Sequence, residues 1–213
     1  MKFGKEYIEF AKNTQGLDFA CKGDWQKIYV QMMDRLFSNY KNGKSLDFGC
    51  ALGANTSAFK DVGYDMIGVD VSEDYINASP FKDVEIKAFD GKKLPYEDGM
   101  FNFIHAQQVM EHIPEKILVK NILPELFRVM KEGGIFFMGT PQGCENGIDP
   151  GDPTHCSCFL SEKWIKLFTK AGFVNVSDKF SPKWEKEPMF IEYKWLQHVF
   201  MKPTNTVEHF ANV

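Results

Sequence analysis

The stretch Leu46-Asp47-Phe48-Gly49-Cys50-Ala51-Leu52-Gly53-Ala54-Asn55 contains the pattern that decides the fold. Its first three residues are typical of the end of a buried strand, and a helical pattern begins at residue 54. Between them, Gly49 and Gly53 allow the main chain to turn tightly and to approach a ligand closely. The first N–H groups of the helix have no partner within it, so they are suited to a phosphate, a carboxylate or a ribose.

Strand and helix patterns alternate along the rest of the chain. We expect seven strands, over residues 45–48, 64–70, 84–89, 101–106, 135–139, 173–180 and 189–201. We expect helices over residues 25–41, 54–61, 73–78, 115–130 and 161–171, with Asp24 and Ser161 as caps and Gly133-Gly134 as a stop signal. This alternation predicts an α/β fold with a mostly parallel seven-stranded sheet between two helical layers, and the two consecutive strands at the end predict an antiparallel edge strand.

Composition excludes several classes of protein. The 213 residues are 44% hydrophobic and 15% aromatic, which supplies enough apolar volume for a folded core. A net charge of −4 argues against a nucleic-acid partner, since phosphate binding needs clustered Lys and Arg. No apolar run approaches the ~20 residues that span a bilayer, so we expect no membrane span. Five cysteines, an odd number without a regular framework, are typical of the reducing cytoplasm.

Three kinds of cofactor site compete for the glycine turn. A dinucleotide site needs Gly-x-Gly-x-x-Gly, but positions 49, 51 and 54 hold Gly, Ala and Ala. A nucleoside triphosphate loop ends in Gly-Lys-Ser or Gly-Lys-Thr, which Gly43-Lys44-Ser45 imitates. That segment precedes the strand instead of following it, and Ser38 stands where the first glycine belongs. The remaining alternative is a pocket for S-adenosylmethionine.

Five segments in order support this last alternative. They are residues 46–53, Ile67-Gly68-Val69-Asp70-Val71-Ser72, Phe89-Asp90-Gly91 ahead of Leu94-Pro95-Tyr96, residues 101–113, and residues 126–134. Together they resemble the class I S-adenosylmethionine-dependent methyltransferases, and the chain is similar to the small ubiquinone-biosynthesis type. The resemblance covers residues 44–180 and implies the Rossmann-like version of the three-layer sandwich.

The resemblance implies a set of cofactor-binding residues. These are Asp47, Gly49, Cys50, Ala51, Gly53, Asp70, Val71, Asp90, Gly91, Gln107 and Gln108. Asp47 is expected to face the ammonium or sulfonium group, the turn to contact the methionine part and the ribose, and Asp90 to accept from the adenine amino group. Asp70 follows Gly49 by 21 residues, close to the spacing at which an acidic residue accepts from ribose hydroxyls.

Two positions depart from the family pattern. Asn102 replaces the usual acidic residue at the start of the fourth strand, where we expect a structural role, and Ala51 replaces the middle glycine of the turn. A methyl group there is tolerable if the turn keeps a negative φ.

The loop over residues 141–159 should lie at the carboxyl ends of the strands, where such sheets bind ligands. His155 is our candidate for contact with the substrate or for a general base, and the alternative is an Asp-Pro turn that His155 stabilises by a hydrogen bond. A zinc site is conceivable from Cys144, His155, Cys156 and Cys158, but a Cys-x-x-Cys pair is missing, so we expect no metal. His105 and the pair Glu111-His112 are expected to be structural.

The predicted activity is methyl transfer from S-adenosyl-L-methionine, with S-adenosyl-L-homocysteine as product. The acceptor is expected to be a small molecule whose oxygen, nitrogen or carbon attacks the sulfonium methyl group in line. A non-catalytic S-adenosylmethionine-binding module of the same fold is the alternative, and the missing glycines disfavour a nicotinamide oxidoreductase. We expect one methyltransferase domain over residues 1–213, with a lead-in at 1–24, a cofactor-binding core at 44–180 and an edge strand with a tail at 181–213, as a monomer or homodimer.

Overall fold

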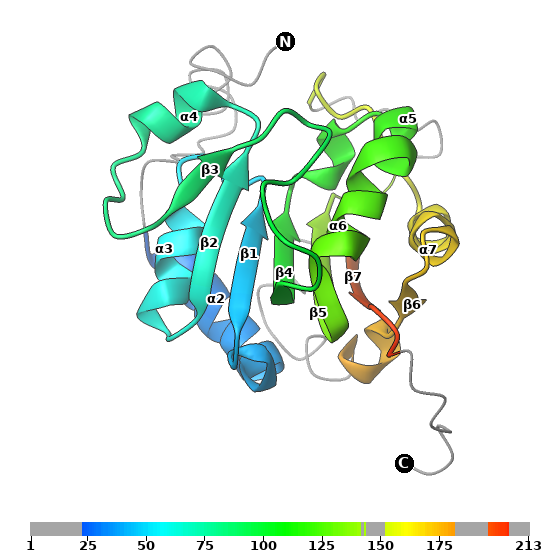
Figure 1. Ribbon diagram of the computed structural model, residues 1–213, viewed down its shortest axis with the longest axis horizontal. Helices are drawn as coiled ribbons and strands as arrows, with labels where there is room; N and C mark the ends of the chain where they lie inside the picture. The colour runs from blue at the N-terminus through cyan, green and yellow to red at the C-terminus, as the bar shows by residue number, and fades with distance from the viewer. Residues whose placement is uncertain (1–22, 142, 144–151, 182–195, 205–213) are drawn as a thin grey trace.

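The computed structural model describes residues 23–141, 143, 152–181 and 196–204 (Figure 1). The described strands form one seven-stranded sheet in the order β3-β2-β1-β4-β5-β7-β6. The strands are β1 Lys44–Phe48, β2 Asp65–Asp70, β3 Ile86–Ala88, β4 Phe101–Gln107, β5 Met130–Thr140, β6 Val174–Asn175 and β7 Leu196–Met201. The strand order reverses between β1 and β4, which makes the carboxyl ends of these two strands the switch point where open α/β sheets bind ligands.

The pairing confirms a mostly parallel sheet with antiparallel pairing at one edge. β1 pairs in parallel with β2 and β4, and β4 pairs in parallel with β5. β7 runs antiparallel to β5 on one side and to β6 on the other. The two last predicted strands are shorter than expected, because β6 has only two residues before a 3-10 turn at Ser177–Lys179. Residues 189–195 of the other lie outside the described residues.

Helices cover both faces of the sheet (Figure 1). They are α2 Asp24–Phe37, followed by a 3-10 turn at Ser38–Tyr40, then α3 Ala54–Asp61, α4 Glu73–Ala78, α5 Glu115–Ile117, α6 Leu123–Val129 and α7 Ser161–Lys170. A π-helical turn over Leu118–Ile122 joins α5 to α6, and Pro124 stands in the first turn of α6. None of the described helices is long and apolar enough to cross a bilayer.

Two hydrophobic cores lie on the two faces because side chains alternate along each strand. In β4, Ile104 and Ala106 belong to the core beneath α6 and α7, whereas Phe103 belongs to the core beneath α2 and α3. Phe168 of α7 stacks on Phe200 of β7, with ring centroids 3.9 Å apart. The three layers are those expected from the alternation of strands and helices.

Three predicted helix boundaries were wrong. Gly23, rather than Asp24, precedes the first turn of α2, and its N–H group donates to the side-chain oxygen of Gln26 at 3.0 Å. Ser161 is the first residue of α7 and not its cap, a position that Leu160 occupies. The third error concerns the end of the helix predicted over residues 115–130.

Gly133-Gly134 does not end that helix. The helix ends at Val129, and β5 begins at Met130. Met130 pairs with Phe101 and Ile135 with Phe103, so the residues between them form a bulge in which Gly133 has φ 74°. Glycine in a strand often marks such a bulge, and here it was mistaken for a helix stop.

Candidate cofactor and acceptor site

The glycine turn is held onto the neighbouring strand. The N–H groups of Gly49 and Cys50 donate to the carbonyl oxygen of Val69 in β2, at 2.8 and 3.1 Å. Gly49 has φ 72°, and a Cβ atom at this position would overlap the side chain of Val109. Gly53, with φ 89°, is the cap residue immediately before α3. Both positions therefore require glycine. Burial raises the pKa of the Cys50 thiol, with a further contribution from the charge of Asp47.

Ala51 corrects one expectation, because its φ of 48° is positive. A residue with a side chain in this left-handed region costs roughly 1–2 kcal/mol. The strain persists because the Ala51 N–H group donates to Asp70 Oδ2 at 2.9 Å. Gln108, at the end of β4, is the other described non-glycine residue with positive φ, at 56°. Backbone strain of this kind concentrates at functional sites, and here both positions follow the strands of the switch point.

We predict that Ala51→Gly stabilises the free protein. Removing the left-handed strain gains more than the extra flexibility of glycine costs in the unfolded chain, so we expect about 0.5–1 kcal/mol, or about 2 °C in Tm. Ala51→Val is the matched variant, and it should lower Tm because a β-branched side chain tolerates positive φ least. Thermal unfolding of both variants at neutral pH measures this, and a lower Tm for Ala51→Gly would show that the strain is absent.

The Asp70 carboxylate is held in a fixed orientation at the end of β2. Its Oδ1 accepts from the N–H group of Ser72, and its Oδ2 accepts from the N–H group of Ala51, both at 2.9 Å. The residue is 6% exposed, and burial raises its pKa above the ordinary value. Each oxygen keeps a further lone pair, so the carboxylate can accept from two more donors.

The residues after Asp70 form one side of the same region. Ser72 caps α4 through its side-chain oxygen, which accepts from the N–H group of Tyr75 at 3.3 Å. Val71 is 50% exposed, so its apolar side chain is available to pack against a flat ligand.

Asp47 takes part in a buried hydrogen-bonded network. Its Oδ2 accepts from the hydroxyl of Thr56 at 2.6 Å, and its Oδ1 lies 2.8 Å from Nδ1 of His105. The His105 Nε2 atom lies 2.7 Å from the hydroxyl of Tyr29, which also lies 3.1 Å from Oε1 of Gln107. A carboxylate only accepts, so Nδ1 of His105 donates to Asp47, and the Tyr29 hydroxyl beside Nε2 donates to Oε1 of Gln107.

This network changes the expected role of Asp47. Because Asp47 is 2% exposed and both of its oxygens contact protein groups, it positions the end of β1, and direct contact with a cofactor stays a prediction. Tyr29 and Thr56 were not predicted from the sequence as members of this network. The available signal was the alternation of side chains along the strand, which places His105 on the same face as Phe103 and Gln107.

Polar atoms without protein partners gather beyond the end of β4. In the described part of the chain, the side-chain NH₂ groups of Gln107 and Gln108 are buried without a hydrogen-bond partner. The same holds for the Thr140 hydroxyl in β5 and the Gln197 amide in β7. Buried polar groups are normally paired, so this group of atoms indicates a place for a polar ligand.

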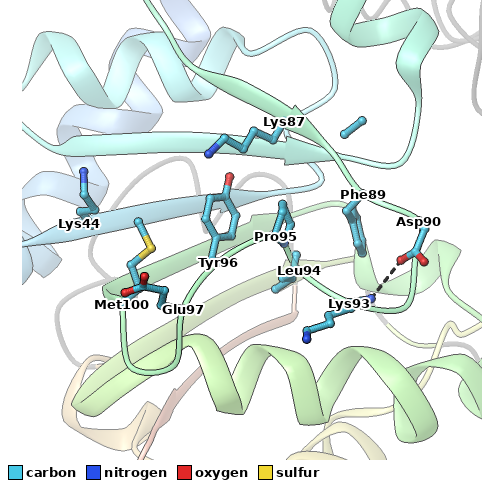
Figure 2. Close-up of a pocket in the computed structure, with 11 residues that line it drawn as sticks. Lys44, Lys87, Phe89, Asp90, Lys93, Leu94, Pro95, Tyr96, Glu97 and Met100 are labelled. Atoms are coloured by element: carbon cyan, nitrogen blue, oxygen red, sulfur yellow. Dashed lines mark hydrogen bonds between the residues drawn. The ribbon is translucent and has the colours of Figure 1, made fainter.

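Asp90 and Gly91 form the predicted Asp-Gly turn. The Asp90 Oδ1 atom accepts from the N–H groups of Lys93 and Lys92, at 3.0 and 2.9 Å, and these bonds hold its pKa below the ordinary value. Asp90 is exposed, and Gly91 has φ 74°. The turn also borders a groove of about 890 Å³ between β3 and the loop that follows it (Figure 2). Lys87, Tyr96 and other residues line this groove, but among the predicted site residues only Asp90 does.

The segment 152–160 brings His155 against the residues that follow β4. The carbonyl oxygen of Glu111 accepts from the N–H groups of Cys156 and Ser157, both at 2.9 Å. His155 Nε2 lies 3.7 Å from Asp152 Oδ2. The His112 ring lies edge-on to the His155 ring, with ring centroids 4.6 Å apart.

The surroundings of His112 and the cysteines bear on the predicted chemistry of this segment. Burial lowers the pKa of His112 to about 4, and the neighbouring His155 contributes, so the His112 ring is neutral at neutral pH. Of the cysteines considered for zinc, Cys156 is exposed and Cys158 buried, both as free thiols, while Cys144 lies outside the described residues.

Comparisons with known proteins agree with this arrangement. The model of the family described as "Methyltransferase domain" matches residues 24–178. A "Probable S-adenosylmethionine-dependent methyltransferase" of Mycolicibacterium smegmatis is 26% identical over 154 residues, which are 70% of this chain and 59% of that protein. The chain thus spans less than two thirds of that relative. The demethylmenaquinone methyltransferase of Bacillus mycoides is 26% identical over 203 residues, covering 88% of this chain and 82% of the relative.

A solved structure supports the fold alone. It is a Haemonchus contortus N-methyltransferase in complex with phosphomonomethylethanolamine and S-adenosylhomocysteine. The similarity has a TM-score of 0.64 at 16% identity and covers 92% of this chain and 57% of that one. With the family model matching most of the chain, the chain belongs to the S-adenosylmethionine-dependent methyltransferases of the methyltransferase-domain family.

Proposed function

We propose that this protein transfers a methyl group from S-adenosylmethionine to a small-molecule acceptor that attacks through oxygen, nitrogen or carbon. The observation that carries the proposal is the fixed Asp70 carboxylate beside the strained turn at Ala51. A carboxylate held by two main-chain amides and still able to accept from two donors suits the two hydroxyls of a ribose. Recognition of such a diol is selective, because a ligand without it would leave a largely buried carboxylate with fewer hydrogen-bond partners.

The other residues of the turn fit the same cofactor. When bound, S-adenosylmethionine supplies an electrophilic methyl group on a positively charged sulfur. The N–H groups at the start of α3 suit its carboxylate, and the exposed side chain of Val71 suits the adenine face. Asp90 is oriented by its turn to accept from the adenine amino group. Asp47 positions the end of β1 through its buried contacts with Thr56 and His105.

The acceptor side of the site is inferred from residues at the ends of β4 and β5 and near the start of β7. The NH₂ groups of Gln107 and Gln108, the Gln197 amide and the Thr140 hydroxyl have no hydrogen-bond partner and suit the polar groups of a small molecule. The Bacillus relative is named for a demethylmenaquinone acceptor, which supports a small-molecule acceptor here. His155 stands at the same end of the sheet, and its role as general base stays a prediction.

Domain organisation and location are inferred from the same observations. We infer that residues 44–180 form the cofactor-binding core of one methyltransferase domain, because the strands that begin with β1 and end with β6 fall within it. We infer a reducing cytoplasmic location from the free thiols of Cys50, Cys156 and Cys158. A monomer or homodimer stays a prediction.

Calorimetric titration with S-adenosylhomocysteine, combined with an assay of its formation from S-adenosylmethionine, tests the function. We expect saturable binding at one site per chain and product formation with some member of a panel of phenols, amines and quinols. No binding at about millimolar ligand, an affinity of roughly −4 kcal/mol or weaker, would contradict the proposal. Binding without turnover of any acceptor would support the non-catalytic module instead.

We also predict that cofactor affinity depends on pH through Asp70. Binding requires the ionised carboxylate, and burial raises the pKa of Asp70 in the free protein. Affinity for S-adenosylhomocysteine should therefore be constant near neutral pH and fall as the pH decreases through this raised pKa, by up to about tenfold per pH unit. Asp70→Asn should bind weakly and lack this step, and an identical pH profile for both proteins would exclude Asp70.

A further inference from the structure

Glu111, His112 and His155 form a compact group of metal-ligating side chains, here called the Glu-His-His cluster. Each offers one ligand atom, and the three atoms lie within 4.8 Å of one another. Among the described residues, this is the one such group of three. The cluster joins two segments, because Glu111 and His112 follow β4 whereas His155 comes from the segment before α7.

The main chain fixes these two segments against each other. The carbonyl oxygen of Glu111 accepts from two consecutive N–H groups, those of Cys156 and Ser157, at 2.9 Å each. The Ser157 hydroxyl donates to the carbonyl oxygen of Ile113 at 2.7 Å. The cluster is therefore built on paired backbone rather than on freely rotating surface side chains.

Hydrogen bonds around the cluster orient one imidazole for a metal. The Thr154 hydroxyl donates to Asp152 Oδ1 at 2.6 Å, and it lies 2.9 Å from Nδ1 of His112. A hydroxyl has a single hydrogen, which the carboxylate takes, so Nδ1 of His112 must donate to the Thr154 oxygen. The lone pair of His112 then resides on Nε2. Metal-bound histidines are commonly held in this way by outer hydrogen bonds.

The donor set indicates the kind of cation. One carboxylate and two neutral imidazoles are the ligands of catalytic zinc sites, which keep an open position for water or substrate. Glu111 is 0% exposed, and a fully buried carboxylate is most stable when a cation is close to it. Asp152, 3% exposed, adds a second buried carboxylate 3.7 Å from Nε2 of His155.

We propose that the Glu-His-His cluster binds a divalent cation, with Zn²⁺ as the best match, and that its open coordination position takes a hydroxyl oxygen of the methyl acceptor. The second half rests on the proposed methyl transfer, and it narrows the acceptor to an oxygen nucleophile. A divalent cation lowers the pKa of an oxygen ligand bound to it, so that the hydroxyl proton passes to water. This assignment differs from the expectation of no metal, and it excludes His155 as the base because the ligating nitrogen has no lone pair for a proton.

Binding of Co²⁺ and Zn²⁺ tests the site without any activity measurement. The full chain is treated with EDTA and dialysed, then titrated with Co²⁺ under visible absorption and with Zn²⁺ by calorimetry. We expect one ion per chain at a Kd in the micromolar range or below, about −8 kcal/mol. His112→Ala and His155→Ala should each weaken binding by about tenfold or more, since each removes a ligand.

Thr154→Val is the sharper variant, because it keeps the shape of the side chain and removes only the hydroxyl that orients His112. We expect a loss of about 10–100-fold in Zn²⁺ affinity with an unchanged fold by circular dichroism. Cys156→Ser is the matched control beside the cluster, and its affinity should equal that of the unchanged protein. Absence of stoichiometric binding, or binding that survives both histidine variants, or binding lost in Cys156→Ser, would overturn the site.

Two further arms separate this proposal from the methyltransferase function. S-adenosylhomocysteine should bind in the presence of EDTA, so binding of it without Co²⁺ binding would reject the metal site and leave the function standing. Acetohydroxamate, a small oxygen ligand, should shift the Co²⁺ spectrum if a coordination position is open. A spectrum that does not respond would overturn the proposed binding of an acceptor hydroxyl.

Discussion

Replacement of Asp70 by alanine should weaken S-adenosylhomocysteine binding by about tenfold or more, which corresponds to about 1.4 kcal/mol or more. Two effects add in this variant. The ribose hydroxyls lose their shared acceptor, and the N–H groups of Ala51 and Ser72 lose the carboxylate that now orders the turn. Hydrogen bonds to a charged group contribute about 1.5–3 kcal/mol each, so tenfold is a lower expectation.

A control at the other end of the same strand makes this result specific. Asp65 begins β2, and its exposed carboxylate lies 3.2 Å from the ammonium group of Lys44. Exposed pairs of this kind contribute little, so Asp65→Ala should leave both the affinity and the stability nearly unchanged. Calorimetry on the two variants side by side measures the difference. Equal affinities for Asp70→Ala and the unchanged protein would remove Asp70 from the site.

The second large effect concerns folding. Asp47→Ala should lower the free energy of unfolding by about 2–6 kcal/mol, because it leaves two buried donors without an acceptor, at a cost of about 1–3 kcal/mol each. His105 and Thr56 both donate to this carboxylate in the interior. For a chain of this size the change corresponds to roughly 10 °C in Tm.

A milder variant removes one hydroxyl of the same buried network. Tyr29→Phe removes only the hydroxyl that lies near His105 and Gln107, so we expect a loss of about 1 kcal/mol. Urea unfolding at neutral pH measures the free energy of unfolding of both variants and shows which of them loses more. If Asp47→Ala cost no more than Tyr29→Phe, the buried network would not hold β1 and β4 together as described.

Local patterns predicted the elements next to the glycine turn. The bounds of α3 and α4 agree with the predicted helices over residues 54–61 and 73–78. The capping and glycine signals for each helix lie within a short stretch of sequence, so they could be recognised without knowledge of the fold. The pattern over residues 64–70 also predicted a strand that ends at Asp70. These features depend on short stretches of chain, and so the sequence contains enough information for them.

Contacts between distant residues could not be predicted in this way. His105 lies 58 residues from Asp47 and 76 residues from Tyr29, and only the folded sheet brings the three together. The positive φ of Ala51 accompanies a hydrogen bond to the distant Asp70, whereas its own residue type favours the opposite sign. For the same reason, the Glu-His-His cluster became visible only when the segment before α7 was placed against the end of β4.

A crystal structure of the protein with S-adenosylhomocysteine tests the central claim most directly. We predict that the ligand lies over the turn at residues 49–53, with both ribose hydroxyls within hydrogen-bond distance of the Asp70 carboxylate and the adenine near Val71 and Asp90. A ligand that binds instead in the groove beside Lys87 and Tyr96, or one whose ribose does not contact Asp70, would contradict this account.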